Sequence, residues 1–473
     1  MIVWNAVVTA IMMAVACAAA SIDGAAWENL RYTRTIDLSR SYVKETGLIL
    51  VKNLQDSPSN EYYLTVGDGN GFVTNISAIS AALVDLDIPI EPELVEPFVY
   101  KLTLPVPVAP QCTLDIKVRF VYVDALQPLP GKIDLAEKQN LLLKLNKFAF
   151  SPYKTKDYTL SFGGITKGQE MEITTANLKA SENVPDVRPE VQENTLQYGP
   201  VLETLEPYTI QPMGLLYEHN RPLTSATNYN RSIWLPGSEV GSVLIEEYYE
   251  LTNKGAELLK GFLRVEWMKG KFEQSRNHFA LSHLEYNAKE LFDDYYVTDL
   301  VGQVSSHRKI ANNLLIQPRF PIFGGWKYNF TLGYHGKLGD YVHKVNDEPD
   351  TYVAKIPLLN TLRDATYGDV YLSFYLPENA EFIDFSSPIA AESLDLGNER
   401  SYLDVSDGHV KVTLHYKNLF DDLSHLDVFI KYRYTKTNYW WKVIKIAGFV
   451  FIGLTSYFLL SLIDISIENK EKK

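Results

Sequence analysis

The pattern that decides the fold is clearest in residues 113–120, which read TLDIKVRF. Apolar residues stand at every second position of this stretch, so their side chains lie on one face of an extended strand. The same alternation recurs at residues 410–416 and 426–432. The 30 Tyr and 21 Phe of the chain also suit the half-buried surface of a sheet. We therefore expect a mostly β fold.

A second pattern, apolar without interruption, fills residues 446–463, where no side chain carries a charge. A helix of about 20 apolar residues is long enough to cross the hydrocarbon layer of a membrane. We predict a transmembrane α-helix at residues 443–464, followed by a short cytosolic tail at 465–473. The aromatic residues 439–441 then belong to the belt at the membrane surface.

The start of the chain predicts which side of the membrane the β part occupies. Residues 6–20 are small and apolar and end in three Ala residues, a pattern that signal peptidase accepts. We predict a cleaved signal peptide at residues 1–20; a second membrane anchor is the alternative, disfavoured because the run is short and rich in Ala. Lys and Arg are more frequent before the C-terminal span than after it, which alone favours the opposite orientation. A long domain, however, crosses the membrane largely regardless of such charge. The prediction is a single-pass type I membrane protein with a luminal ectodomain.

Composition restricts the class of protein further. The formal net charge of −13 argues against nucleic acid as a partner, because binding to nucleic acid needs a basic face. Cys17 leaves with the signal peptide, so Cys112 is the single cysteine of the mature chain and cannot form an internal disulfide. Large extracellular proteins usually carry several disulfides. The composition therefore favours residence in the endoplasmic reticulum over the cell surface.

Three tripeptides of the form Asn-X-Ser/Thr lie between the predicted signal peptide and the predicted span. They begin at Asn75, Asn230 and Asn329. All three fall in the part of the chain predicted to be luminal, where such tripeptides accept N-linked glycans. We interpret the chain as a candidate glycoprotein.

The predicted ectodomain is too long for one compact domain. Pro, Asn and other polar residues gather at residues 219–229, and we place there the boundary between two tandem, luminal, β-sandwich-like domains, residues 21–225 and 226–438. Residues 34–38, RTIDL, are echoed by residues 231–235, RSIWL, at an offset of 231 − 34 = 197 residues. The echo indicates that the two domains are related.

Two segments depart from the β pattern. At residues 135–148, Leu141, Leu142, Leu145 and Phe148 share one face of a helix. We predict an α-helix there that covers the end of a sheet. Residues 281–292 are a second, less regular helix candidate.

A search for catalytic chemistry finds two weak motifs. Asp85-Leu86-Asp87 is a D-x-D match that would suit a divalent cation, although a polar turn explains it more simply. The glycines at residues 67–71 lie between strand-like flanks, which predict a hairpin turn and not the strand and helix that cradle phosphate. The chain has no HExxH and no GxSxG. We expect no catalytic residue, metal site or cofactor; an enzyme built on Asp85 and Asp87 is the alternative.

Residues 316–331 read IQPRFPIFGGWKYNFT. This stretch resembles the signature of the ribophorin I family, and residues 246–254 and 295–302 resemble further blocks of that family, closest to its fungal form. The likeness covers the signal, the ectodomain and the span. The signature residues that we single out, as family markers and as candidates for contact with partners, are Pro318, Arg319, Phe320, Pro321, Phe323, Gly324, Gly325 and Trp326.

The resemblance implies a non-catalytic subunit of the oligosaccharyltransferase complex in the endoplasmic reticulum membrane. That complex transfers a preassembled oligosaccharide from dolichyl diphosphate to Asn in Asn-X-Ser/Thr sites of nascent proteins, and a separate, many-spanning subunit carries the catalysis. The implied partners are that subunit, the other subunits, nascent acceptor polypeptides and the lipid bilayer. For the signature aromatics, the alternative to a contact surface is an ordinary packed turn. A surface receptor is a third reading of the chain, disfavoured by its single cysteine.

Overall fold

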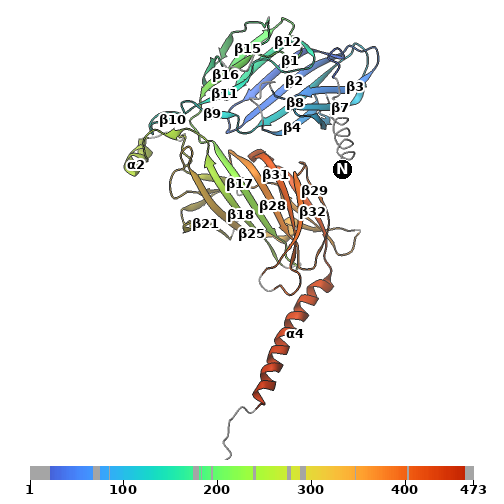
Figure 1. Ribbon diagram of the computed structural model, residues 1–473, viewed down its shortest axis with the longest axis vertical. Helices are drawn as coiled ribbons and strands as arrows, with labels where there is room; N and C mark the ends of the chain where they lie inside the picture. Colours follow the sequence, from blue (N-terminus) through green and yellow to red (C-terminus); the bar gives the residue numbers. More distant parts are fainter. Residues whose placement is uncertain are drawn as a thin grey trace, which may run out of the picture.

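The computed structural model describes residues 22–463 except 68–74, 85, 174–179, 183, 193–194, 238–240, 274–277, 288–293, 347 and 402–403. The predicted signal peptide, the predicted cytosolic tail, Asp85 and most of the glycine cluster therefore lie outside the described residues. Two β-rich lobes and one long C-terminal helix follow one another along the molecule (Figure 1).

The first lobe is built around an eight-stranded sheet with the order β14-β15-β12-β1-β2-β8-β4-β5. Its strands are, in that order, Pro189–Gln192, Thr195–Val201, Lys154–Gly163, Trp27–Asp37, Val43–Asn53, Thr113–Tyr122, Ile76–Leu83 and Pro89–Ile90. The residues whose alternation predicted a strand form most of β8, and Ile116 and Val118 in it are fully buried. That prediction is confirmed.

Two smaller sheets complete the first lobe. One has the order β13-β16-β11-β9, with the strands Thr166–Met171, Pro212–Glu218, Asn140–Asn146 and Leu126–Pro128. The other has the order β3-β7-β6, with the strands Ser59–Thr65, Val99–Val108 and Pro92–Glu96. A two-stranded parallel pair, β10 (Lys132–Ile133) with β19 (Glu257–Leu258), joins the first lobe to the second.

The second lobe is built around another eight-stranded sheet, with the order β22-β21-β25-β18-β17-β28-β31-β30. Its strands are, in that order, Gly302–Gln303, Tyr295–Asp299, Lys327–Lys337, Ser242–Asn253, Thr224–Trp234, Ala365–Tyr375, His409–Phe420 and Ser393–Glu399. A four-stranded sheet, β26-β27-β32-β29, contains Val342–Lys344, Thr351–Pro357, Asp427–Arg433 and Glu381–Ser386. A three-stranded sheet, β20-β24-β23, contains Leu284–Asn287, Asn313–Ile316 and His307–Ile310. The alternating stretches 410–416 and 426–432 fall in β31 and β32, as predicted.

The helices in the described part of the chain are few. They are α2 (Arg264–Glu273), α3 (Leu338–Tyr341), the 3-10 helix η1 (Asp421–His425) and α4 (Lys436–Ser461). No residue of helix α4 is buried, and the helix is apolar and long enough to cross a membrane. It begins seven residues before the predicted span, because Thr435 caps its first turn by accepting a hydrogen bond from the Asn438 N–H.

The helix predicted at residues 135–148 is wrong. Residues Asn140–Asn146 form strand β11, in which Leu141, Leu143 and Leu145 are buried at every second position. The run of leucines fits the period of a helix as well as that of a strand. The segment is a strand because it pairs with β16 on one side and β9 on the other. The candidate helix at 281–292 is also wrong where the structure describes it, because β20 occupies Leu284–Asn287.

The two eight-stranded sheets have the same arrangement at their centres. Strand β1 pairs antiparallel with β2 and parallel with β12, and β17 pairs antiparallel with β18 and parallel with β28. The bounds of β1 and β17 differ by 224 − 27 = 197 and 234 − 37 = 197 residues, the offset of the sequence echo. Each strand also has a bulge at the same point, after Asn29 and after Ala226. The echo therefore marks strands with equal lengths and equivalent neighbours.

Each lobe has its own hydrophobic core, and a few side chains connect the two. One core contains residues of β1, β2, β8 and β12 among other segments, and the other contains residues of β17, β18, β25 and β28 among other segments. Tyr42, Val121 and Val123 of the first lobe, however, pack into the second core. Apolar packing thus joins the lobes in addition to the polypeptide that connects them.

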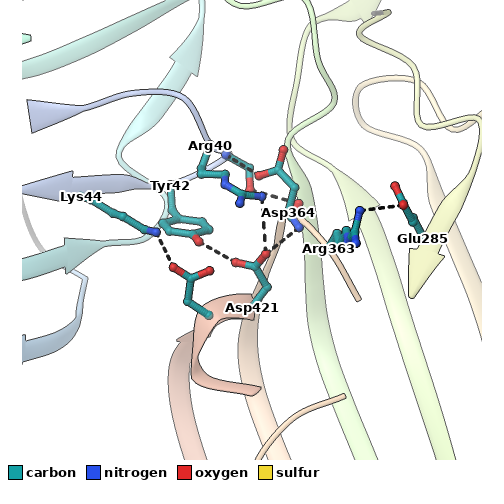
Figure 2. A network of polar contacts seen from close by, with 9 residues as sticks. Arg40, Tyr42, Lys44, Glu285, Arg363, Asp364 and Asp421 are labelled. Carbon is teal, nitrogen blue, oxygen red and sulfur yellow. Dashed lines mark hydrogen bonds and ion pairs between the residues drawn. The ribbon is translucent and has the colours of Figure 1, made fainter. Parts of the chain in front are cut away.

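Polar contacts surround Tyr42 where the lobes meet, and we call this region the seam (Figure 2). The Tyr42 hydroxyl donates to Oδ1 of Asp421 at 2.6 Å, and the other oxygen of Asp421 accepts the backbone N–H of Asp364 at 2.8 Å. Oδ1 of Asp364 in turn accepts the N–H of Ser41 at 2.8 Å. Lys44 forms an ion pair with Asp422 beside them. Tyr42 itself is fully buried, so the seam is a packed junction.

Helix α4 is tied to the second lobe by charge. The ammonium of Lys442 lies 2.7 Å from Glu378 and 3.1 Å from Asp404. Both carboxylates are almost fully buried, whereas Lys442 is one-third exposed. One turn earlier, the Asn438 side chain donates to the carbonyl of Asn379 at 2.8 Å. The start of the helix therefore has a fixed position against the lobe.

Candidate functional site

The signature stretch forms a tight turn before strand β25. Ile322 bridges to Leu281, and the Trp326 N–H closes the turn on the Phe323 carbonyl at 3.0 Å. A Cβ at Gly324 would lie 2.2 Å from the carbonyl oxygens of Gly255 and Ala256, so any larger residue would displace backbone. Gly325 has φ +78°, in the region that favours glycine. Gly324 is therefore required by the close approach of backbone, and Gly325 is favoured by its positive φ.

The turn carries a small core of aromatic rings. Phe323 is fully buried, and the rings of Trp267, Phe279 and Trp326 lie with their centroids 5.4 to 5.7 Å from it. These spacings fit the edge-on and tilted contacts that aromatic pairs prefer. The ring of Phe323 is therefore unavailable to a partner, and the predicted aromatic surface is reduced to Phe320, which is 38% exposed, and part of Trp326.

Arg319 is held beside this turn by an ion pair. Its guanidinium donates to both carboxylate oxygens of Asp299 and to the carbonyls of Gly302 and Gln303. Burial acts to raise the pKa of the Asp299 carboxyl, but the hydrogen bonds from Arg319 and from the Val301 N–H outweigh it, and the pKa lies below its usual value. The charged form of Asp299 therefore fixes Arg319 in place.

The turn also packs against the segment that connects the two lobes. Gln139 of the first lobe is fully buried; it accepts the Ala256 N–H at 2.7 Å and donates to the carbonyls of His219 and Arg221. Ala256 is one of the two residues that Gly324 contacts. The signature residues thus brace the segment through which the two lobes are connected.

Apolar side chains are exposed over this turn, on and before helix α2. They are Leu259, Leu263, Val265 and Met268, exposed by 58, 57, 67 and 44%. We call them, together with Phe320, the signature patch. Helix α2 projects from the side of the molecule at the level where the lobes meet (Figure 1). Sequence reasoning missed this patch because α2 has no continuous apolar face that would mark it as a helix.

Each sheet contains one buried ion pair that sequence reasoning did not find. The guanidinium of Arg34 contacts both oxygens of Glu45 at 2.6 and 2.8 Å, and Nε of Arg231 lies 3.1 Å from Glu247. A tyrosine from the neighbouring strand completes each network. Tyr122 of β8 donates to Glu45 at 2.8 Å, and Tyr334 of β25 donates to Glu247 at 2.9 Å. Both arginines stood in the sequence echo, which was the available signal.

The Asn-X-Ser/Thr sites lie in different settings. Asn230 is in the middle of β17 and Asn329 is near the start of β25, both in the second sheet and both half-buried. Asn75 precedes β4 in the first lobe, and its carbonyl accepts the Val123 N–H at 3.0 Å. The sheet thus brings two of the three sites together.

The motifs considered for catalysis are not assembled into a site in the described residues. Asp87 is exposed, and Asp85 lies outside the described part of the chain. The hairpin predicted around the glycine cluster lies mostly outside the described residues; of its described flanks, β3 pairs with β7, and β4 pairs with β8 and β5. Within the described ranges no group of three or more His, Cys, Asp or Glu could hold a metal ion.

Comparison with known proteins gives one family. The family model described as Ribophorin I matches residues 27–461. Dolichyl-diphosphooligosaccharide–protein glycosyltransferase subunit 1 of Caenorhabditis elegans is 26% identical over 88% of this chain and 69% of its own length. Subunit 1 of Schizosaccharomyces pombe is 24% identical over 92% of this chain and 95% of its own length. The solved structure of leukotriene A4 hydrolase from Saccharomyces cerevisiae is 12% identical over 44% of this chain and 32% of that chain, with a TM-score of 0.28. At that score the likeness says nothing about fold or function.

Proposed function

The chain belongs to the ribophorin I family, and from this premise we propose that it is an accessory subunit of the oligosaccharyltransferase complex. That complex transfers a preassembled oligosaccharide from dolichyl diphosphate to Asn in Asn-X-Ser/Thr sites of nascent proteins. The observation that carries the proposal is the family match over nearly the whole chain, together with relatives whose names are those of subunit 1 of this glycosyltransferase. In this assignment a separate, many-spanning subunit performs the transfer.

The proposal includes a topology. Helix α4 spans the membrane of the endoplasmic reticulum, the part before it stands in the lumen, and the tail at 465–473 is cytosolic. Support comes from the length of α4, since 26 residues rise about 39 Å, enough for the hydrocarbon layer and one interface. Trp440 and Trp441 at its start are 60 and 54% exposed, as rings at a membrane surface would be.

We propose that the luminal part consists of two domains, with the boundary at residues 225 and 226. The two separate hydrophobic cores support this division. The junction between them is packed at the seam and at Gln139, and α4 is anchored by Lys442. A subunit built in this way would hold its partners at a fixed height above the membrane. Its role is to brace the catalytic subunit and to help present acceptor polypeptide.

The signature patch is our proposal for a contact with another subunit. Large apolar side chains that are left exposed on a surface are typical of sites that bind another protein. Phe320 is 38% exposed, so Phe320→Ala removes an exposed apolar ring from this patch. The substitution should reduce the amount of complex recovered. Phe429→Ala is the matched control, because Phe429 is 39% exposed and lies on β32, outside the signature patch.

The test begins with a tag on the C-terminal tail and purification from membranes in mild detergent. We would assay the purified material for co-purifying subunits and for transfer of lipid-linked oligosaccharide to a peptide with an Asn-X-Thr site. We expect a many-spanning subunit to co-purify, and we expect the activity to survive Asp85→Ala combined with Asp87→Ala. Activity from this chain alone that is abolished by those two substitutions would contradict the proposal.

A further inference from the structure

The two faces of the second eight-stranded sheet differ in character. Along β17, β18, β25 and β28 every second side chain is buried in the core, among them Tyr229, Tyr249 and Phe330. The side chains between them are half-exposed and mostly polar. We call the surface that they form the outer face. Because its side chains keep contact with solvent at the centre of the sheet, no other layer of the described chain seals it.

Two Asn-X-Ser/Thr sites open onto this outer face. Asn230 of β17 stands opposite Tyr248 of β18 on one side and opposite Tyr371 of β28 on the other. On the next strand, Thr331 stands opposite Tyr248, and Asn329 is two residues away on the same face. The amide nitrogen of Asn329 donates to the Tyr248 hydroxyl at 3.1 Å. Tyr248 therefore lies between both acceptor amides.

We propose that Asn230 and Asn329 both carry N-linked glycans and that these glycans cover the outer face, packing on the rings of Tyr248 and Tyr371. In the transfer, the side-chain nitrogen loses one hydrogen as a proton and bonds to the anomeric carbon of a lipid-linked oligosaccharide. The bond from that carbon to the lipid diphosphate breaks, and the diphosphate leaves with the electron pair. A glycosylated amide keeps one N–H, so Asn329 can still donate to Tyr248.

The surroundings of the two amides suit a sugar. Tyrosine offers a flat apolar ring with a polar hydroxyl, which suits a partner with apolar C–H groups and many hydroxyls. Glu250 lies opposite Asn329 and offers carboxylate oxygens as acceptors for sugar hydroxyls. Both asparagines point away from the core, so an attached glycan requires no change in the packing of Tyr229, Tyr249 or Phe330.

The proposal limits where partner subunits bind. A face covered by two bulky, solvated glycans is closed to a broad protein interface. Partners of the second lobe must then use its edges, its membrane end or the signature patch. This inference rests on the luminal topology in the proposed function, but occupancy of the two sites does not require the chain to assemble with a complex.

The first experiment uses the full chain expressed in endoplasmic reticulum membranes. We would compare Asn230→Gln, Asn329→Gln and the double variant by gel mobility, with and without an enzyme that removes N-linked glycans. Each single variant should migrate faster by the mass of one glycan, and the double variant should migrate faster by the mass of two. After the glycans are removed, all forms should migrate alike. If either substitution leaves the mobility unchanged, the proposal is overturned for that site. Ser232→Ala and Thr331→Ala destroy the same sites without changing the asparagines, and they replace any glutamine variant that does not fold.

The second experiment tests the packing on tyrosine. Tyr248→Ala should lower the midpoint of thermal unfolding in both the glycosylated chain and the chain whose glycans have been removed enzymatically, first sugar included. The decrease should be several degrees larger in the glycosylated chain. Tyr352→Ala, at a half-buried tyrosine of β27, is the matched control and should cost the same in both forms. An equal cost of Tyr248→Ala in both forms would mean that the glycans do not pack on this ring.

Discussion

Arg34 and Arg231 each neutralise a glutamate at the centre of a sheet. Both partners of each pair are at most 4% exposed, so neither glutamate has water as an alternative partner. Removal of one member of such a pair leaves a buried charge without compensation, which is far more costly than loss of a surface pair.

The first prediction therefore concerns these arginines. Arg34→Met and Arg231→Met should each lower the free energy of unfolding by about 3–5 kcal/mol, because Glu45 or Glu247 stays buried and charged. Arg34→Met combined with Glu45→Leu should cost much less than Arg34→Met alone. Chemical denaturation of the purified chain measures these differences.

A surface pair provides the control. Arg363 lies 2.7 Å from Glu285, and both are more than one-third exposed. Arg363→Met should change the free energy of unfolding by about 1 kcal/mol or less. Equal effects at Arg34 and Arg363 would show that burial does not govern the cost.

A second prediction concerns His219 and pH. Burial, helped by the nearby Arg221 charge, lowers the pKa of His219 from 6.5 to about 4. Because the folded pKa is below the unfolded one, the stabilisation is present above pH 6.5 and is lost as pH falls towards 4. Between pH 7 and pH 5 this group alone should cost about 2 kcal/mol.

Thermal unfolding at pH 7 and pH 5 checks this. The difference between the two midpoints should be smaller in His219→Phe than in the unchanged chain. His343→Phe is the control, since His343 is exposed. A pH response that is the same in His219→Phe as in the unchanged chain would contradict the assignment.

At the residue scale, sequence reasoning went as far as local signals allowed. The echo contained Arg34 and Arg231, and the spacing of Gly324 and Gly325 indicated a tight turn. The tyrosines that complete their networks could not be predicted, because Tyr122 lies 77 residues from its partner Glu45 and Tyr334 lies 103 residues from its partner Arg231. The burial of Phe323 was missed for the same reason, since its neighbours come from three separate segments.

At the scale of elements, Lys442 fixes the start of helix α4. It lies between two buried carboxylates, Glu378 and Asp404, and its charge helps to hold the pKa of both below the usual value against the effect of burial, which raises them. Lys442→Met leaves the two carboxylates close together without a cation. We expect α4 to lose its fixed orientation against the second lobe.

Electron paramagnetic resonance can measure this loss. In a Cys112→Ser background, spin labels at Ile452 of α4 and Lys417 of β31 should give a narrow distribution of distances. Lys442→Met should broaden it. Lys445→Met, which removes a charge one turn later, should not, and equal broadening by both would indicate a general effect of charge at the membrane surface.

Elements were predicted well where one period was unambiguous. Strands β8, β31 and β32 have one buried and one exposed face, so period two was visible in the sequence. Strand β11 was misread as a helix because adjacent leucines fill both faces of it, and only its pairing with β16 and β9 decides the period. The span was predicted from composition alone, although its first turns are polar and were missed.

At the scale of the whole molecule, the seam makes one body of the two lobes. Tyr42 belongs to the first lobe, but its side chain is buried in the second core, against Phe420 and Asp421.

Tyr42→Ala should lower the free energy of unfolding by about 3–5 kcal/mol. The single calorimetric transition should then separate into two, because each lobe has its own core. Tyr62→Ala, buried in the first core only, should keep one transition. A single transition in Tyr42→Ala would contradict this role of the seam.

The sequence predicted two β-rich regions before a span, but not the seam. Its contacts join residues that are more than 300 positions apart, such as Ser41 and Asp364. Such pairs leave no local pattern of hydrophobicity or turn residues. The arrangement of the lobes was therefore beyond what periodicity and spacing could provide.

The parallel pairs at the sheet centres have a consequence for timing. Strand β17 ends at Trp234 and its parallel neighbour β28 starts at Ala365, which is 365 − 234 = 131 positions later. At about 5–20 residues per second, the ribosome needs on the order of ten seconds to make that length. Asn230 therefore stays in an unfinished sheet for that interval. Asn329, in contrast, emerges when its neighbour β18 has already been made. We expect a higher occupancy of Asn230 than of Asn329 by glycans. Mass spectrometry of the two peptides would measure this difference. The speed of synthesis would then set how much sugar the finished chain carries.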